Sequence, residues 1–350
     1  MNQESSKQDG YDVVVVGGGA AGLSGALTLA RARRSVLVID AAQPRNAPAG
    51  HVHGYLGHEG RPPAELLTVG RDEVTAYGGR IVNGEVVSAH ALPGRDQEAG
   101  GFDVVLRDGT RHRARRLLVT TGLEDELPQL PGLAERWGRD VLHCPYCHGW
   151  EVRDGAVGVL GTSPFMAHQA LLWRQWSERV TLFQHTAPEP TEEEREQLAA
   201  RGVTVVTGRV ESLQITGDRL TGVRLADGRT VPCEALVVSP NMTVRREMLA
   251  SLGLRTTEHL MNGHFMGHYF ATDPTGATEV PGVWAAGNVA DLTATVIGAA
   301  AAGMRAAVAI NGDLISEDTR LAVAARRVPF SAAAEREVAD RVLGDRRHGL

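Results

Sequence analysis

The 350-residue sequence has few cysteines, few aromatic residues and no cluster of positive charge. Its three cysteines, Cys144, Cys147 and Cys233, are too few for the disulfide framework of a small secreted protein. The formal net charge is −6 and no run of Lys and Arg stands out, so nucleic acid and anionic membranes are not expected partners. Aromatic residues make up only 5% beside 41 glycines, which favours an α/β fold over a β-sandwich.

Long hydrophobic runs are also missing. The longest apolar stretch, residues 13–30, is broken by five glycines and a serine, and a later Ala-rich stretch, 297–310, contains Arg305. Neither stretch predicts a membrane span. Residues 1–10 are polar, lack the layout of a signal peptide and are expected to form a disordered leader. We therefore expect a soluble, cytoplasmic protein.

The first segment after this leader has the pattern of a dinucleotide-binding unit. An apolar, β-branched run at 11–16 predicts a central parallel strand, and a helix is expected from about residue 20 to 33. Between them stand Gly17, Gly19 and Gly22 in G-x-G-x-x-G spacing. The sequence therefore predicts a strand, a glycine-rich turn and a helix in the order that a dinucleotide site requires.

Each glycine of this turn has a physical role in such a site. Gly17 permits the sharp turn, Gly19 lets the backbone approach a pyrophosphate, and Gly22 allows the helix to pack closely on the strand. The helix N-terminus then offers unpaired N–H groups to the anion. Asp40 ends the next predicted strand, 18 residues after Gly22, where its carboxylate can accept hydrogen bonds from a ribose hydroxyl.

Two later segments repeat parts of this outline. Residues 156–160, 164–177 and 180–183 predict a second strand–helix–strand unit, and a buried strand at 283–286 leads into Gly287 and a helix rich in small residues. Residues 81–120 are expected to form a small antiparallel insert with a turn at Asp108-Gly109. The charged tail is expected to end in a helix that Ser331 caps.

The segment 143–151, HCPYCHGWE, contains the one Cys-x-x-Cys pair in the chain. Cys-x-x-Cys-His is the attachment motif of c-type haem, two cysteines with two histidines can hold zinc, and the pair can also be a redox dithiol. The absence of an export signal disfavours haem, and the absence of a second Cys-x-x-Cys disfavours a closed zinc site. A redox dithiol is therefore favoured.

A second group of histidines, His51, His53 and His58, lies in the Gly- and Pro-rich stretch 43–67. His51 and His53 would share one face of a strand, as metal ligands can. A polar loop over a cofactor is the favoured interpretation, and no metal is expected. Cys233, far from the redox pair in an apolar segment, is expected to be a core thiol.

The order of the N-terminal glycine motif, the Cys-x-x-Cys pair before a second βαβ unit, and the C-terminal W-A-A-G-N-V resembles the low-molecular-weight thioredoxin reductase family of flavoproteins. The resemblance implies an α/β fold of two Rossmann-like, three-layer ββα dinucleotide-binding domains, the second inserted into the first. It places an FAD-binding domain at 11–123 and 245–315, an inserted NAD(P)-binding-like domain at 124–244 and a helical tail at 316–350. It also implies a homodimer.

The resemblance also assigns residues to the site. Its cofactor-binding residues come from the first unit, from the strand that ends at residue 122 and from the C-terminal motif: Gly17, Gly19, Ala20, Ala21, Gly22, Asp40, Ala41, Arg45, Asn46, His53, Val87, Thr121, Gly122, Gly287, Asn288, Val289 and Val296. Asn288 stands where the family usually has an Asp that contacts the ribityl chain. Its catalytic residues are Cys144, Cys147, His148 and, as a weaker candidate, His143.

The inserted unit departs from the family at its nucleotide-binding turn. Residues 161–166, GTSPFM, have Thr and Ser where glycines let a pyrophosphate approach, followed by bulky Phe165 and Met166. Residues 184–194 are acidic and contain no Arg or Lys to hold the 2′-phosphate of NADPH. NADPH is therefore disfavoured as the electron donor.

The cysteine segment resembles a subgroup of the family, the flavin dithiol oxidases that close disulfides in natural products of the holomycin, gliotoxin and romidepsin type. His148 stands where ordinary thioredoxin reductases have an acidic Asp. The resemblance implies that Cys147 faces FAD, that Cys144 meets a small-molecule dithiol, and that O2 accepts the electrons. The alternatives are an NADPH- or ferredoxin-dependent reductase of thioredoxin-like proteins and a flavin redox sensor that does not turn over.

Overall fold

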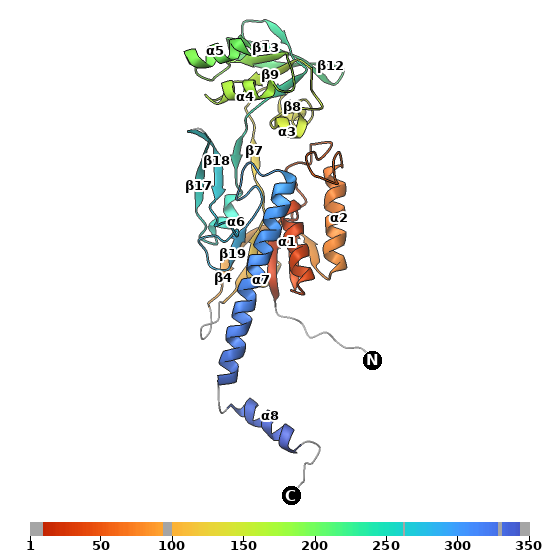
Figure 1. Cartoon of the computed structure of the whole chain (residues 1–350), viewed down its shortest axis with the longest axis vertical. Helices are drawn as coiled ribbons and strands as arrows, with labels where there is room; N and C mark the ends of the chain where they lie inside the picture. Colours follow the sequence, from red (N-terminus) through yellow and green to blue (C-terminus); the bar gives the residue numbers. More distant parts are fainter. Residues whose placement is uncertain (1–9, 94–99, 262, 328–330, 344–350) are drawn as a thin grey trace.

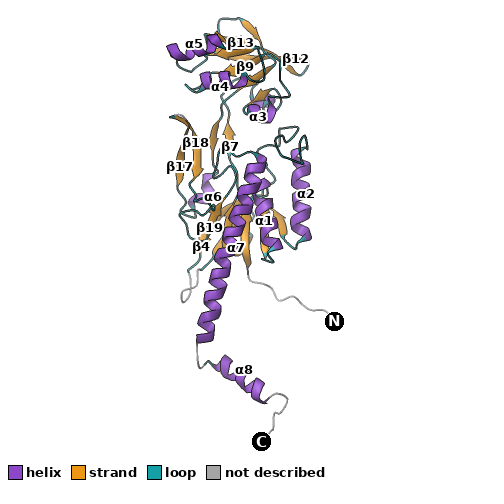
Figure 2. Ribbon diagram, viewed as in Figure 1, coloured by secondary structure: helices purple, strands orange, loops and turns teal. Residues whose placement is uncertain are grey.

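The structure is a computed structural model that describes residues 10–93, 100–261, 263–327 and 331–343. All but Gly10 of the predicted leader lies outside these residues. Figure 1 shows two sheet-containing bodies along the long axis, with a long helix extending from the lower one. Figure 2 shows that helices cover the sheets of both bodies.

A seven-stranded sheet forms the centre of the lower body, in the order β3-β2-β1-β6-β5-β4 with β19 paired to β6. Its parallel strands are β1 (Tyr11–Val16), β2 (Val36–Asp40), β3 (Arg80–Asn83), β6 (Arg111–Val119) and β19 (Val283–Ala285). Its antiparallel edge consists of β4 (Val86–Ala91) and β5 (Phe102–Leu106). The prediction of a separate antiparallel insert over 81–120 is wrong for β3. That strand pairs in parallel with β2 because its apolar residues extend the main sheet.

Three helices, α1 (Ala20–Arg31), α2 (Pro63–Ala76) and α7 (Val296–Arg327), bury an apolar cluster against one face of this sheet. Gly303 lets α7 approach α1 closely, since a Cβ there would lie 1.9 Å from the carbonyl oxygen of Ala21. The other face packs on α6 (Arg246–Ala250) and Phe270. The core therefore fixes the ends of β1 and β6, where the site lies.

The chain crosses between the two bodies on a pair of short strands. These strands, β7 (Glu124–Glu126) and β16 (Asn241–Thr243), pair antiparallel and belong to a four-stranded sheet with β17 (Thr256–Met261) and β18 (His264–Phe270). Everything between them in sequence forms the upper body (Figure 1). The second unit is thus inserted into the first, as predicted, while the exact domain limits stay a prediction.

The upper body contains a second parallel sheet, in the order β11-β10-β9-β15-β8. Its strands are β8 (Val141–Leu142), β9 (Val157–Leu160), β10 (Val180–Phe183), β11 (Thr204–Val206) and β15 (Ala235–Val237). A smaller sheet holds β12 (Val210–Thr216), β13 (Arg219–Leu225) and β14 (Thr230–Pro232). Its helices are a 3-10 turn (Ala134–Arg136), α3 (Pro145–His148), α4 (Met166–Trp173) and α5 (Glu192–Ala200). The two-domain Rossmann-like α/β fold is confirmed.

The C-terminal part is helical and continuous with the lower body. Helix α7 passes residue 315 without a break, and buried Glu317 pairs with Arg115 at 2.8 Å and with Arg116 at 3.2 Å. A last helix, α8 (Ala332–Leu343), follows, and the hydroxyl of Ser331 accepts a hydrogen bond from the Ala334 amide at 3.0 Å. The predicted cap is confirmed. Among the described helices, none combines the length and the apolar content that crossing a bilayer requires.

Candidate active site

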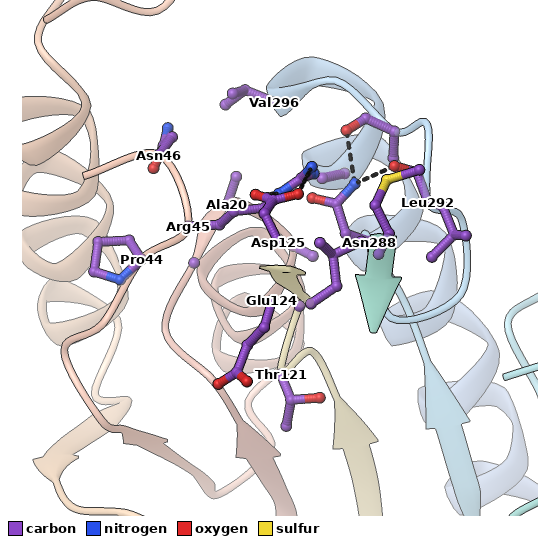
Figure 3. Close-up of a pocket in the computed structure, with 18 of the residues that line it drawn as sticks. Ala20, Pro44, Arg45, Asn46, Thr121, Glu124, Asp125, Asn288, Leu292 and Val296 are labelled. Atoms are coloured by element: carbon purple, nitrogen blue, oxygen red, sulfur yellow. Dashed lines mark hydrogen bonds and ion pairs between the residues drawn. The ribbon is translucent and has the colours of Figure 1, made fainter. Parts of the chain in front are cut away.

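One cavity of about 1290 Å³ extends from the glycine turn of the main sheet to the cysteine segment of the inserted unit. All four predicted catalytic residues line it, and so do all the predicted cofactor residues except Gly22 and Val289. Val289 is instead buried in the core beneath the main sheet. Residues that the sequence separates by more than a hundred positions therefore share one chamber, part of which Figure 3 shows.

The glycine turn after β1 has the shape that an anion-binding turn needs. Gly17 has φ of 107°, which favours glycine, and a Cβ on Gly22 would lie 1.9 Å from the Gly17 carbonyl oxygen. A Cβ on Gly19 would meet open space, and no side chain caps the N-terminus of α1. The uncapped helix end therefore faces the cavity, and this arrangement suits a pyrophosphate.

Asp40 ends β2 beside this turn and is already engaged by the protein. One carboxylate oxygen accepts from the Gly18 amide at 3.1 Å, and the other accepts from the guanidinium of Arg71 at 2.6 Å. Each carboxylate oxygen has a further lone pair for a ribose hydroxyl. Sequence analysis missed Arg71, which lies 31 residues from Asp40 on α2, because no local pattern links the two.

Asn288 has a structural role that explains why it replaces the usual Asp. Its Nδ2 donates to the carbonyl oxygens of Asp291, Leu292 and Ala294 at 3.2, 3.4 and 3.0 Å (Figure 3 shows Asn288 beside Leu292). A carboxylate cannot donate these bonds. The amide therefore fixes the turn that precedes α7, and its Oδ1 remains an acceptor at the cavity.

Arg45 joins the lower body to the crossing strand. Its guanidinium makes two hydrogen bonds of 2.7 Å to Asp125 on β7, whose side chain is only 7% exposed (Figure 3). The positive charge also lies near enough to Cys144 and Cys147 to favour their thiolates. The predicted cofactor residue thus lines the cavity that the glycine turn and the sulfurs share, and its partner Asp125 was not found from the sequence.

The redox cysteines lie at the start of the short helix α3, where Cys144 is the N-cap residue and Cys147 follows one turn later. The structure holds them as free thiols. A hydrogen bond from the Cys147 thiol, aided by the amides of Cys147 and Tyr146, lowers the pKa of Cys144 to about 7 against the effect of burial. The same bond and burial raise the pKa of Cys147. The charge of the reduced pair therefore resides on Cys144.

Cys233 behaves differently. It is 1% exposed, its thiol donates to the Ala235 carbonyl at 2.9 Å, and burial raises its pKa to about 12. The predicted core thiol is confirmed.

The two histidines that flank the cysteines have unlike surroundings. His143 donates from Nδ1 to the carbonyl of Val238 at 3.2 Å, and burial lowers its pKa. Both ring nitrogens of His148 are shielded from solvent and have no hydrogen-bond partner within the described part of the chain. Burial lowers the pKa of His148 while Glu151 opposes this effect. A neutral imidazole in the cavity that the sulfurs line can accept a proton.

The turn after β9, the counterpart of the glycine turn after β1, packs tightly against the segment that follows β10. A Cβ on Gly161 would lie 2.3 Å from the Met166 sulfur and 2.6 Å from the Gln184 carbonyl. The amides of Thr186 and Ala187 both donate to the Gly161 carbonyl oxygen, at 3.0 and 3.1 Å. The segment after β10 therefore folds back over the turn.

The N-terminus of α5, which follows β10, is closed by side-chain caps. Thr191 and Glu194 form a reciprocal capping box at the start of α5, with the Glu194 carboxylate accepting from the Thr191 amide at 2.7 Å. This satisfies amides that would otherwise be available to an anion.

The His51–His53 stretch forms a loop, not a metal-binding strand. The rings of His51 and His53 lie 6.0 Å apart, but Nδ1 of His53 contacts the Glu59 carboxylate at 2.6 Å. Among the residues that the structure describes, no three His, Cys, Asp or Glu side chains are grouped as metal ligands.

Comparisons with known proteins agree with this arrangement. Residues 11–312 match the model of the family described as pyridine nucleotide-disulphide oxidoreductase. Thioredoxin reductase tcpT of Claviceps purpurea (strain 20.1) is 30% identical over 288 residues, which cover 79% of this chain and 86% of that protein. Thioredoxin reductase sirT of Leptosphaeria maculans is 29% identical over 325 residues, 88% and 95% of the two chains.

Solved structures are similar over most of the chain. The crystal structure of HlmI has a TM-score of 0.85 and 46% identity, covering 92% of this chain and 98% of that one. An oxidoreductase from Agrobacterium tumefaciens has a TM-score of 0.80 and 37% identity, covering 87% and 99%. The resemblance drawn from the sequence is confirmed. The chain is an oxidoreductase that belongs to the pyridine nucleotide-disulphide oxidoreductase family, whose thioredoxin reductase-like members use a flavin.

Proposed function

We propose that the chain is an FAD-dependent dithiol oxidase. It closes an intramolecular disulfide in a small-molecule dithiol through Cys144 and Cys147, and O2 takes the electrons to give hydrogen peroxide. One observation carries the proposal: the turn after β9 has Thr162 and Ser163 in place of glycines and buries the bulky side chains of Phe165 and Met166, while the glycine turn after β1 and the sulfurs share one cavity.

The closed turn argues against a nicotinamide donor. A pyrophosphate has to approach the backbone at the first turn of a βαβ unit, and here Thr162 and Ser163 replace the glycines while bulky Phe165 and Met166 are buried at the start of α4. The capping box of Thr191 and Glu194 occupies the start of α5. The acidic stretch 184–194 adds repulsion of a 2′-phosphate. The inserted unit is therefore better suited to a thiol substrate than to NADPH as the electron donor.

The residues of the lower body fit FAD. Gly17 and Gly19 with the uncapped start of α1 would hold its pyrophosphate, Asp40 its ribose, and Oδ1 of Asn288 would accept from its ribityl chain. When bound, FAD supplies the two-electron acceptor that returns the cysteines to their disulfide and passes the electrons to O2.

The thiol chemistry follows from the unequal acidities of the two cysteines. A substrate thiolate attacks Cys144 of the Cys144–Cys147 disulfide, and Cys147 departs as a thiolate. The second substrate thiolate then attacks the substrate sulfur held on Cys144, which releases the cyclic disulfide. Cys144 is a good leaving group in this second step because its pKa is about 7. The cysteines keep the electron pair, and both thiol protons end on hydrogen peroxide.

His148 serves as the base that produces the thiolates. It follows Cys147 directly, lines the same cavity and is neutral near pH 7 because burial lowers its pKa. Exposed Tyr146 on α3 lines the cavity and offers apolar contact to a compact substrate.

Anaerobic bleaching of the flavin tests the proposal. The purified yellow protein is mixed with NADPH in one cell and with dithiothreitol in another, and air is then admitted. We expect bleaching by dithiothreitol alone and hydrogen peroxide after reoxygenation. Cys144→Ser should keep the flavin and lose bleaching, whereas Cys233→Ala, a change in the core, should keep the wild-type rate.

The relatives that are named thioredoxin reductase favour an alternative function, the reduction of thioredoxin-like proteins. Rapid bleaching by NADPH, with thiol formation in an added disulfide protein, would select that rival. A flavin that bleaches once and is not reoxidised by air would select a redox sensor.

A further inference from the structure

One wall of the cavity is formed by the helix that follows the turn after β9. The cavity-lining residues at α4 are spaced three and four apart, which puts them on one face of the helix: Phe165, His168, Gln169 and Leu172. Four positions beyond Leu172, the ring of Trp176 contacts that of Tyr146 at 5.3 Å. Tyr146 also lines the cavity, so this wall extends from the start of α4 to the short helix that holds Cys147.

A second wall is formed by the β17–β18 hairpin of the lower body. Its cavity-lining residues are Met261, Phe265, Met266 and His268. The rings of Phe265 and His268 lie 5.0 Å apart, and the ring of His264 lies 6.4 Å from that of Phe165. The hairpin therefore reaches the inserted unit, and Figure 1 shows it below α4. We call the lining residues of α4 and of the hairpin, together with Tyr146, the α4–β18 subsite.

The subsite carries no carboxylate, ammonium or guanidinium group. The acidic and basic residues among the described lining of the cavity come from the main-sheet side, the crossing strand and the start of α6: Asp40, Arg45, Glu85, Arg107, Glu124, Asp125, Glu126 and Arg245. Arg45, whose charge acts on both cysteines, is paired with Asp125 through two hydrogen bonds of 2.7 Å. An ionised group that left water for this subsite would find no opposite charge on its walls, so the subsite favours an uncharged occupant.

Two polar atoms of the subsite lack a hydrogen bond. Gln169 is 8% exposed, and its Oε1 is shielded from water without a partner among the described residues. Nδ1 of His268 is in the same situation. Because a buried polar atom without a hydrogen bond is unfavourable, such atoms beside a cavity indicate a ligand that supplies the missing partner. An amide oxygen only accepts, so the partner of Gln169 is an N–H or O–H group.

We propose that the α4–β18 subsite binds the substrate, and that the substrate is an uncharged dithiol with an amide whose N–H donates to Oε1 of Gln169. The inference rests on the proposed oxidase function and names the chemical class of its substrate. A carboxamide both accepts and donates, so Gln169 can pair with both polar groups of a substrate amide, which favours an amide over a hydroxyl. The apolar part of the substrate packs on Phe265 and Tyr146.

Three dithiols with one carbon skeleton test the subsite. Dihydrolipoamide is uncharged and has an amide N–H, its N,N-dimethylamide is uncharged and has none, and dihydrolipoate is an anion at neutral pH. Anaerobic stopped flow measures the rate of flavin bleaching against the concentration of each. We expect dihydrolipoamide to bleach the flavin about tenfold faster than its N,N-dimethylamide and about 10- to 100-fold faster than dihydrolipoate at equal low concentration.

Substitutions at the two walls locate the effect. Gln169→Leu should keep the bound flavin and slow dihydrolipoamide to the rate of the N,N-dimethylamide, because the acceptor is gone. Phe265→Ala should slow both amides by about tenfold through lost apolar contact. Leu260→Ala is the matched control, since Leu260 belongs to the same hairpin but is 57% exposed and does not line the cavity. It should keep all three rates within about twofold of wild type.

Equal rates for the three dithiols with wild-type protein would overturn the subsite, and so would faster bleaching by dihydrolipoate. A preference for the N–H that survives in Gln169→Leu would overturn the role of Gln169. These results leave the oxidase proposal standing, provided that dithiothreitol bleaches the flavin. Wild-type flavin that stays yellow with dithiothreitol and with dihydrolipoamide would overturn the oxidase proposal itself.

Discussion

Removing the Cys147 thiol should weaken the acidity of Cys144 by a measurable amount. The largest cause of the low Cys144 pKa, about 7, is the hydrogen bond from Cys147. A hydrogen bond to a charged group contributes about 1.5–3 kcal/mol, and one pKa unit corresponds to about 1.4 kcal/mol. Cys147→Ala should therefore raise the pKa of Cys144 by about 1–2 units, towards that of an ordinary thiol. The amides of Cys147 and Tyr146 remain and limit the rise.

Alkylation of the reduced protein by iodoacetamide measures this pKa, because only the thiolate reacts and the rate rises as pH passes through the pKa. Mass spectrometry assigns the label to Cys144, since Cys233 is buried with a pKa of about 12. Cys147→Ser is the matched control, as its hydroxyl can still donate, so its midpoint should stay nearer 7 than that of the alanine variant. Equal midpoints for Cys147→Ala and Cys147→Ser would show that this hydrogen bond does not lower the pKa of Cys144.

Two further substitutions separate stability from cofactor binding. Gly22→Ala places a Cβ 1.9 Å from the Gly17 carbonyl, so it should lower the thermal midpoint and lose flavin. A Cβ on Gly19 would meet no protein atom but would stand where the pyrophosphate approaches the backbone. Gly19→Ala should therefore lose flavin while its apoprotein unfolds at the wild-type temperature. An equal fall in the thermal midpoints of the Gly22→Ala and Gly19→Ala variants would contradict this. Asn288→Asp removes three donated bonds, and we expect the free energy of unfolding in urea to fall by about 1–3 kcal/mol. An unchanged unfolding curve would show that the turn does not depend on them.

The parts of the site that the sequence predicted are those set by local pattern. The turn at Gly17, Gly19 and Gly22 and the pair Cys144–Cys147 depend on spacing within a few residues, and the structure places both at one cavity. The α/β class followed from composition and local pattern, whereas the inserted two-domain arrangement followed from the resemblance to the thioredoxin reductase family. Residues 81–120 were assigned in part wrongly because an edge strand that joins the main sheet has the same local pattern as one that forms its own hairpin.

The parts that the sequence did not predict depend on contacts between distant segments. Arg71 on α2 reaches Asp40 at the end of β2, and Asp125 on the crossing strand β7 pairs with Arg45. The partners of His53 come from both bodies, so no spacing rule connects them. Asn288 was recognised as a departure, but its reason, three carbonyl acceptors in one turn, is visible only in three dimensions.

The packing of the turn after β9 bears on how an engineered variant could be given a more open nucleotide-binding turn. Glycine at Thr162 and Ser163 would still leave the buried side chains of Phe165 and Met166 at the start of α4. The amides of Thr186 and Ala187 would also have to give up the Gly161 carbonyl. Opening this turn would therefore take coordinated changes at the start of α4 and in the segment that follows β10.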